Sequence, residues 1–155
     1  MKALFDGVCT ALSMYSILPA PRVEWNRNTM KYAMACFPLV GACIGAAVFG
    51  LDRLLRTLNA APLLYAALMF AVPVLLSGAI HMDGFVDTCD ALFSRRPREE
   101  KLQILKDPHV GAFGVVSVCL LCVVSLGLYA QLYARGAAAW LVSFSPVVFR
   151  CLSGL

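Results

Sequence analysis

The chain has 155 residues, the size of one ordinary domain, and 61% of them are hydrophobic while only 14% are charged. A soluble domain carries roughly 45–50% apolar and about 25% charged residues, and the mean hydropathy here is +0.78. Polar surface is scarce and the net charge of +4 is modest. These values exclude a disordered chain, a soluble globule and a nucleic-acid-binding module built on a basic surface. They predict an all-α, polytopic integral membrane protein, a helix bundle in a lipid bilayer.

The N-terminal segment, residues 3–20, is apolar but contains Asp6, and it ends in a proline-rich stretch with Pro19 and Pro21. The acidic residue and the lack of a continuous apolar core argue against a cleaved signal peptide. We expect a re-entrant or interfacial segment instead.

Four apolar stretches are then expected to span the membrane, since a helix needs about 20 residues to do so. They cover residues 34–51, 60–80, 110–134 and 137–155. Gly41 and Gly45 in the first stretch have the four-residue spacing that lets helices approach closely. The seven cysteines lie mostly inside apolar runs, where a free thiol behaves as a small hydrophobe, so no disulfides are expected. Residues 1–155 are treated as one membrane domain.

A polar loop, residues 81–109, separates the second and third stretches. It holds six of the nine acidic residues and five of the thirteen basic ones. Basic residues on its side of the membrane number nine: Lys2, Arg22, Arg27, Lys31, Arg95, Arg96, Arg98, Lys101 and Lys106. The opposite side has three: Arg53, Arg56 and Arg135. The positive-inside rule therefore places this loop in the cytoplasm.

Three aspartates of the loop, Asp83, Asp87 and Asp90, have the helical spacing i, i+4, i+7. On a helix they point within about 60° of one another, whereas Phe85 and Cys89 fall on the opposite arc. The stripe has no Lys or Arg partner at i+4. It therefore predicts an amphipathic helix that binds a cation, and Mg²⁺ is typically held by carboxylates together with substrate phosphates.

A second short helix is expected to follow, capped by Ser94 and stopped at Asp107–Pro108. Its basic residues lie close to the aspartates: Arg95, Arg96, Arg98, Lys101 and Lys106. Carboxylates for Mg²⁺ beside cationic groups for phosphate oxygens are what phosphoryl transfer requires. Gly111 and Gly114 would let the backbone approach a bulky ligand.

Plainer interpretations stand beside these. A charged loop is usually a solvated face, although an unpaired stripe of one sign weakens that interpretation. His81 alone is more often a satisfied polar residue than a ligand. Arg150 lies inside an apolar run, where a charge is costly and usually functional, and snorkelling to the interface explains it equally well.

At these residues the sequence resembles the adenosylcobinamide-GDP ribazoletransferase (cobalamin 5′-phosphate synthase) family. The resemblance rests on Gly78–Phe93 (GAIHMDGFVDTCDALF), Lys101–Asp107 (KLQILKD) and Val110–Gly114 (VGAFG). Leu18–Arg22 (LPAPR) and Phe37–Gly41 (FPLVG) are similar to the family's opening motifs. The resemblance covers essentially the whole chain and implies that it is an N-terminal portion of the family fold, whose C-terminal part is absent.

The resemblance implies an Mg²⁺-dependent transferase of the bacterial inner (cytoplasmic) membrane. It would join adenosylcobinamide-GDP to α-ribazole or its 5′-phosphate and release GMP, late in cobalamin (vitamin B12) biosynthesis. The implied metal ligands are Asp83, Asp87 and Asp90. The implied catalytic residues are Asp83, Asp87 and Asp107, with Asp107 either a further ligand or the base. The implied substrate-binding residues are His81, Arg95, Arg96, Lys106 and Arg150. A homo-oligomer, or association with other corrinoid-pathway enzymes, is left open.

Other functions predict different patterns. A cation transporter would place its acidic residues at mid-membrane on discontinuous helices, whereas this stripe follows an expected complete span and is flanked by arginines. A CDP-alcohol-type membrane phosphotransferase also spaces aspartates at helical intervals. It pairs Asp-Gly with a nearby Ala-Arg, which is absent after Asp83–Gly84. A non-catalytic scaffold has no reason to keep unpaired carboxylates together.

Overall fold

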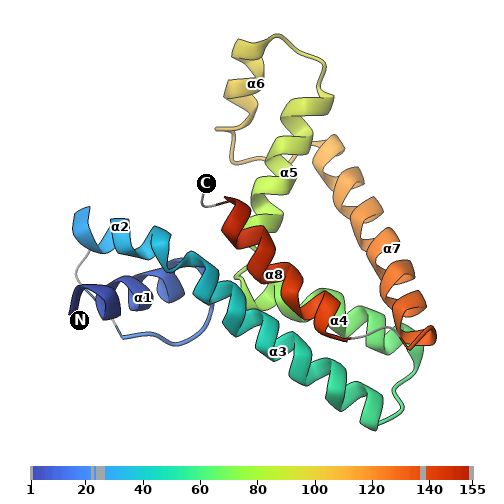
Figure 1. The fold of residues 1–155 in the computed structure, drawn as a ribbon. Helices are drawn as coiled ribbons and strands as arrows, with labels where there is room; N and C mark the ends of the chain where they lie inside the picture. The colour runs from blue at the N-terminus through green and yellow to red at the C-terminus, as the bar shows by residue number, and fades with distance from the viewer. Residues whose placement is uncertain (1, 22, 24–26, 137–138, 154–155) are drawn as a thin grey trace.

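The computed structural model describes residues 2–21, 23, 27–136 and 139–153, and within these residues every regular element is a helix. In chain order the helices are α1 (Lys2–Tyr15), α2 (Arg27–Ala35), α3 (Phe37–Thr57), α4 (Pro62–Leu76), α5 (Ile80–Phe93), α6 (Arg98–Ile104), α7 (Ala112–Ala134) and α8 (Ala139–Ser153). The all-α prediction is confirmed (Figure 1).

Helices α3 and α7 are each long and apolar enough to cross a membrane. They correspond to the stretches expected over residues 34–51 and 110–134, but α3 starts at Phe37 and continues to Thr57, because residues 34 and 35 belong to α2, and α7 starts at Ala112. The stretch expected over 60–80 is instead α4, which ends at Leu76, and α4 passes the same test only together with α5, to which it is bent by 95°. The described residues therefore hold two such helices, or three if the bent pair counts as one span. The 137–155 stretch contains the shorter helix α8.

The bend between α4 and α5 has a local cause. Gly78 and Ala79 both have positive φ, +64° and +58°, a left-handed conformation that ends a helix. The amide of Ala79 donates to the carbonyl of Val74, and the Gly78 amide donates to Leu75. From the N-terminal segment, the Ile17 amide donates to the Leu76 carbonyl at 2.9 Å. These bonds satisfy backbone groups at the break, and α5 turns away from the line of α4 (Figure 1).

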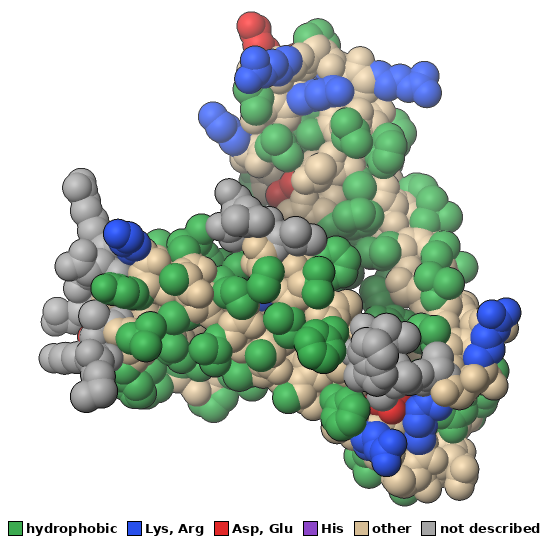
Figure 2. Space-filling model, viewed as in Figure 1, with side chains coloured by type: hydrophobic (Ala, Val, Ile, Leu, Met, Phe, Trp, Pro, Cys, Tyr) green, Lys and Arg blue, Asp and Glu red, His purple; other side chains and the backbone are tan. Residues whose placement is uncertain are grey.

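Helix α3 is the centre of the core. Its buried face repeats every four residues at Val40, Ile44 and Val48 and packs with Tyr65 and Met69 of α4. Helix α7 contributes less to the core than α3. In its most apolar stretch 6% of the residues are buried, whereas in that of α3 39% are buried. Apolar side chains also cover much of the outer surface, and Lys and Arg cluster at the α6 end and at the opposite end (Figure 2). An apolar belt between two basic ends fits a bilayer.

Helices α3 and α8 lie against each other along their length (Figure 1). A Cβ atom on Gly41 would lie 2.6 Å from the Pro146 carbonyl oxygen and 2.9 Å from Cα of Val147. A Cβ atom on Gly45 would collide with the carbonyl oxygen of Ser143. The two glycines thus permit backbone-to-backbone contact, as their spacing predicts.

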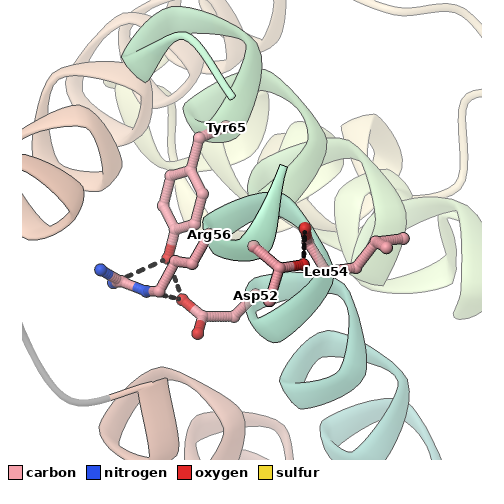
Figure 3. Close-up of polar contacts among 5 residues, drawn as sticks. Asp52, Leu54, Arg56 and Tyr65 are labelled. Carbon is pink, nitrogen blue, oxygen red and sulfur yellow. Dashed lines mark hydrogen bonds and ion pairs between the residues drawn. The ribbon is translucent and has the colours of Figure 1, made fainter. Parts of the chain in front are cut away.

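A buried polar network joins three helices at the far end of α3 (Figure 3). Asp52 is fully buried, and its Oδ1 accepts hydrogen bonds from the Tyr65 hydroxyl at 2.5 Å and from Nε of Arg56 at 2.9 Å. The Arg56 guanidinium also lies 5.4 Å from the ring centroid of Tyr65 and 5.2 Å from that of Tyr133. The network ties α3 to α4 and, through Tyr133, to α7.

The close α3–α8 contact predicts that Gly45→Leu destabilises the fold by at least about 1–3 kcal/mol, the usual range for overpacking. Gly50→Leu is the matched control, since a Cβ there meets no atom within 4 Å. Unfolding of the detergent-solubilised chain by dodecyl sulfate, followed by circular dichroism, measures both. Equal midpoints for the two variants would contradict the packing.

The polar network predicts that Arg56→Leu costs about 3–5 kcal/mol, because it leaves the Asp52 carboxylate buried without its ion pair. The double variant Asp52→Leu/Arg56→Leu removes both charges and is expected to recover most of that loss. The same unfolding assay tests both. A double variant less stable than Arg56→Leu would show that the pair is not coupled in this way.

Candidate active site

Helix α5 carries the aspartate stripe, as the spacing predicts. Asp83 is in the first turn, where unpaired amides favour a negative charge. Exposure falls along the helix: Asp83 is exposed, Asp87 is half-buried and Asp90 is buried, with 7% of its surface accessible. The three carboxylates therefore meet three different environments.

Asp90 is bonded to the start of α7. Its Oδ2 accepts a hydrogen bond from the Gly111 amide and its Oδ1 one from the Gly114 amide, both at 2.8 Å. The first amides of a helix have no partner within it, and a carboxylate there also meets the positive end of the helix dipole. Asp90 is thus the N-terminal cap of α7, supplied from 21 to 24 residues away.

The glycines of α7 make this contact sterically feasible. A Cβ on Gly111 or Gly114 would collide with the Asp90 carboxylate. The sequence predicts that these glycines make room for a ligand, and in the structure they make room for the Asp90 side chain. Each Asp90 oxygen keeps a lone pair beyond its amide bond, and Asp90 still lines a groove.

Asp107 follows α6 and is paired locally. Its Oδ1 accepts from the backbone amide of His109 at 3.0 Å and lies 2.6 Å from Nδ1 of the same residue. The backbone hydrogen bond, and then the side-chain bond, lower the pKa of Asp107 below its ordinary value. The carboxyl is therefore ionised at neutral pH, which suits a ligand to a cation better than a strong proton acceptor.

A groove of about 510 Å³ lies between the end of α5, α6 and the start of α7. It brings together Asp90, Arg96, Asp107 and His109. Arg96 also forms an exposed ion pair with Glu100 at 2.9 Å, and such a pair is worth little and is easily exchanged for a ligand. The groove thus combines carboxylates with one guanidinium at the polar end of the molecule.

The other predicted residues do not all lie in this groove. Asp83 and Asp87 stand on α5 outside its lining, and Arg95 and Lys106 are exposed and also outside it. His81 and Arg150 line a separate cavity. His109 and Ser94 line the groove but were not predicted as site residues. The one sequence feature that indicates a role for His109 is its position directly after Asp107–Pro108.

The chemistry of these groups fits a divalent cation in part. Asp83 and Asp87, one helical turn apart, form no ion pair with other side chains in the described residues. Across the part of the chain that the structure describes, no three His, Cys, Asp or Glu side chains form a metal-binding group. Mg²⁺ commonly uses one or two carboxylates with waters and phosphates, and Asp83 and Asp87 are two carboxylates of this kind on one helix.

The cap predicts a stability effect for Asp90. Asp90→Ala leaves two amides of α7 without their acceptor and is expected to cost about 1–3 kcal/mol, whereas Asp90→Asn keeps one acceptor and costs less. Asp83→Ala, on the exposed turn, is the control and is expected to leave stability unchanged. Thermal unfolding in dodecyl maltoside checks the order. If Asp90→Ala and Asp83→Ala unfold at the same temperature, the cap does not stabilise α7.

The chain is similar to several curated proteins. The adenosylcobinamide-GDP ribazoletransferase of Clostridium botulinum (strain Eklund 17B) is 39% identical over 150 residues, which are 97% of this chain and 60% of the relative. That of Clostridium perfringens (strain 13) is 38% identical over 154 residues, 99% of this chain and 61% of the relative. That of Lachnoclostridium phytofermentans is 41% identical, with 97% and 57% covered. The chain thus spans about three fifths of the length of these curated relatives.

No solved structure matches the chain. The profile of the family described as cobalamin-5-phosphate synthase matches residues 7–155. This match includes the aspartates of α5, the α6 segment and the start of α7. The chain therefore belongs to the cobalamin-5-phosphate synthase family.

Proposed function

We propose that this chain provides the phosphoryl-transfer site of an adenosylcobinamide-GDP ribazoletransferase. The reaction would move the phosphocobinamide group of adenosylcobinamide-GDP to α-ribazole or its 5′-phosphate and release GMP. The observation that carries the proposal is the pair Asp83 and Asp87, which forms no ion pair among the described residues. The pair lies on a helix that also borders a groove containing Arg96. The names of the relatives supply the substrates.

Asp83 and Asp87 would hold Mg²⁺, whereas both Asp90 oxygens accept amide hydrogen bonds at the start of α7. A bound divalent ion neutralises phosphate charge and polarises the phosphoryl oxygen. Asp90 has a positioning role, because its bonds to α7 fix the end of α5. The paired carboxylates would therefore meet the diphosphate at the end of α5.

The basic residues would bind the phosphate oxygens. Arg96 lines the groove, and Arg95 and Lys106 are exposed at either end of the segment that contains α6. Guanidinium groups bind phosphate through paired hydrogen bonds. Arg96 can exchange Glu100 for a phosphate at a small cost in free energy, because its present ion pair is exposed.

The proposed chemical step is a displacement at the phosphorus attached to cobinamide. The ribazole hydroxyl oxygen forms a new P–O bond, the P–O bond to GMP breaks, and GMP leaves with that electron pair. The hydroxyl proton goes to Asp107 or, where Asp107 is a further metal ligand, to the phosphate oxygen of the departing GMP. The lowered pKa of Asp107 favours its role as a metal ligand.

The proposed location is the bacterial inner membrane, with α6 on the cytoplasmic side. Five basic residues lie in or next to α6, and three lie at the opposite end of the described bundle. The first group is Arg95, Arg96, Arg98, Lys101 and Lys106, and the second is Arg53, Arg56 and Arg135. The positive-inside rule supports this orientation. Water-soluble nucleotides would then reach the groove from the cytoplasm.

The proposed reaction predicts Mg²⁺-dependent GMP release from adenosylcobinamide-GDP and α-ribazole phosphate by the chain in detergent. Asp87→Ala is expected to lower the rate by more than about 100-fold, since loss of even a second-shell partner costs roughly 10–100-fold. Glu99→Gln, an exposed acid in the first turn of α6, is the matched control and retains the rate. Chromatographic detection of GMP with and without chelator provides the measurement.

Binding separates an incomplete catalyst from a wrong assignment. If the folded chain releases no GMP but binds adenosylcobinamide-GDP in a manner that requires both Mg²⁺ and Asp87, the site is correct and the reaction needs the further length that the relatives have. If neither Mg²⁺ nor Asp87 affects binding, the phosphoryl-transfer assignment fails.

A further inference from the structure

A second cavity lies between α3, α4, α5, α7 and α8 and opens to the surface, where Phe149 of its lining is 71% exposed. Its volume is about 550 Å³, within the range of small-molecule sites, which are mostly apolar with a few polar groups. Three aromatic side chains line it, Phe85, Tyr129 and Phe149. An adjoining hollow of about 460 Å³ shares these three residues and His81, and Figure 2 shows the surface hollowed between α7 and the rest of the molecule.

The cavity is not part of the aspartate site. His81 and Phe85, four residues apart on α5, line it, and no aspartate of α5 is among its lining residues. The aspartates occupy the other side of the same helix, because Asp83 and Asp87 are offset by two residues from that pair. Helix α5 thus separates two sites of different chemistry.

One end of the cavity is cationic. Arg150 lines it with only 5% of its surface exposed, and its guanidinium lies 5.6 Å from the ring centroid of Phe37. The His81 ring is 6.3 Å from the same centroid, so both basic side chains gather around one ring. Ser77 and Ser145 add hydroxyl groups to the lining. A charge this deep in an apolar bundle is costly and is usually functional.

Basic pockets between membrane helices bind phosphate head groups, and arginine binds phosphate by paired hydrogen bonds. We propose that this cavity binds a molecule with an apolar body and one phosphate group, with the body among Phe85, Tyr129 and Phe149 and the phosphate at Arg150. Two sources share that chemistry, a phospholipid of the bilayer and a nucleotide with an apolar aromatic base. Only the nucleotide source rests on the proposed function, through α-ribazole phosphate.

The test measures binding to the full chain in the neutral detergent dodecyl maltoside. Two matched pairs of probes differ only in the phosphate: lysophosphatidic acid with monoacylglycerol, and α-ribazole 5′-phosphate with α-ribazole. In at least one pair, the phosphate-bearing probe is expected to bind about 10- to 100-fold more tightly, as for a hydrogen bond to a charged group. Arg150→Gln should abolish this preference, and Arg150→Lys should retain part of it.

Two further variants test whether the effect is specific to Arg150 and to this cavity. Arg135→Gln, an exposed arginine at the end of α7, is expected to leave the preference unchanged. Val74→Phe, which places a larger side chain in the lining, should weaken both members of the pair equally. Circular dichroism and the unfolding midpoint establish that each variant is folded.

Tighter binding of lysophosphatidic acid than of monoacylglycerol, with no such difference in the nucleotide pair, identifies a lipid site. Tighter binding of α-ribazole 5′-phosphate than of α-ribazole, with no such difference in the lipid pair, identifies a substrate site. Either result supports the proposal. Equal affinities within both pairs, no binding of either phosphate probe, or a preference that survives Arg150→Gln would overturn it. The outcome is independent of the aspartate site, because Asp87→Ala is expected to leave this binding unchanged while it abolishes GMP release.

Discussion

The bond between Asp90 and the start of α7 is the interaction on which the polar end of the molecule depends. It joins residues 21 and 24 positions apart with two hydrogen bonds of 2.8 Å. The intervening helix α6 has no buried residue, so this segment has little apolar packing of its own to hold it. The capped end of α7 therefore anchors the segment, and the groove with Arg96 and Asp107 forms beside that anchor.

The break at Gly78–Ala79 explains why α5 can serve two sites. A continuous helix from α4 would have kept the aspartates in line with the apolar bundle, where unpaired carboxylates are costly. The 95° bend instead directs α5 toward the polar end. One face of α5 then carries the carboxylates, while His81 and Phe85 face the internal cavity. A left-handed turn of two residues thus separates a polar site from an apolar one.

Much of this arrangement follows from the sequence. Composition predicts the all-helical membrane fold. The spacing of Asp83 and Asp87 predicts the amphipathic α5, and the spacing of Gly41 and Gly45 predicts close packing, because both features rest on local periodicity. Family membership was likewise visible in the motif around His81 and Asp83. These features depend on residues within a few turns of one another.

The remaining features depend on contacts between distant residues. The positive φ of Ala79 is unusual for a residue with a Cβ, so the apolar run through residue 80 predicts one continuous helix. The capping role of Asp90 depends on amides far along the chain. Ser94 was expected to cap α6, yet Pro97 holds that position and the Ser94 hydroxyl donates to Ala91. Spacing alone shows which residues share a face, and tertiary contacts determine what that face meets.

Asp52 and Arg150 show how such contacts distinguish two buried charges. Both lie in apolar helices and are almost wholly buried. The free-energy cost of burying a charge therefore makes each a functional candidate. Asp52 accepts bonds from Tyr65 and Arg56, and these bonds join helices of the fold. Arg150 lines a cavity large enough for a small molecule. The first charge is explained by the cohesion of the bundle, whereas the second donates to the Pro146 carbonyl within α8 and lies at the end of the cavity that the proposed phosphate would occupy.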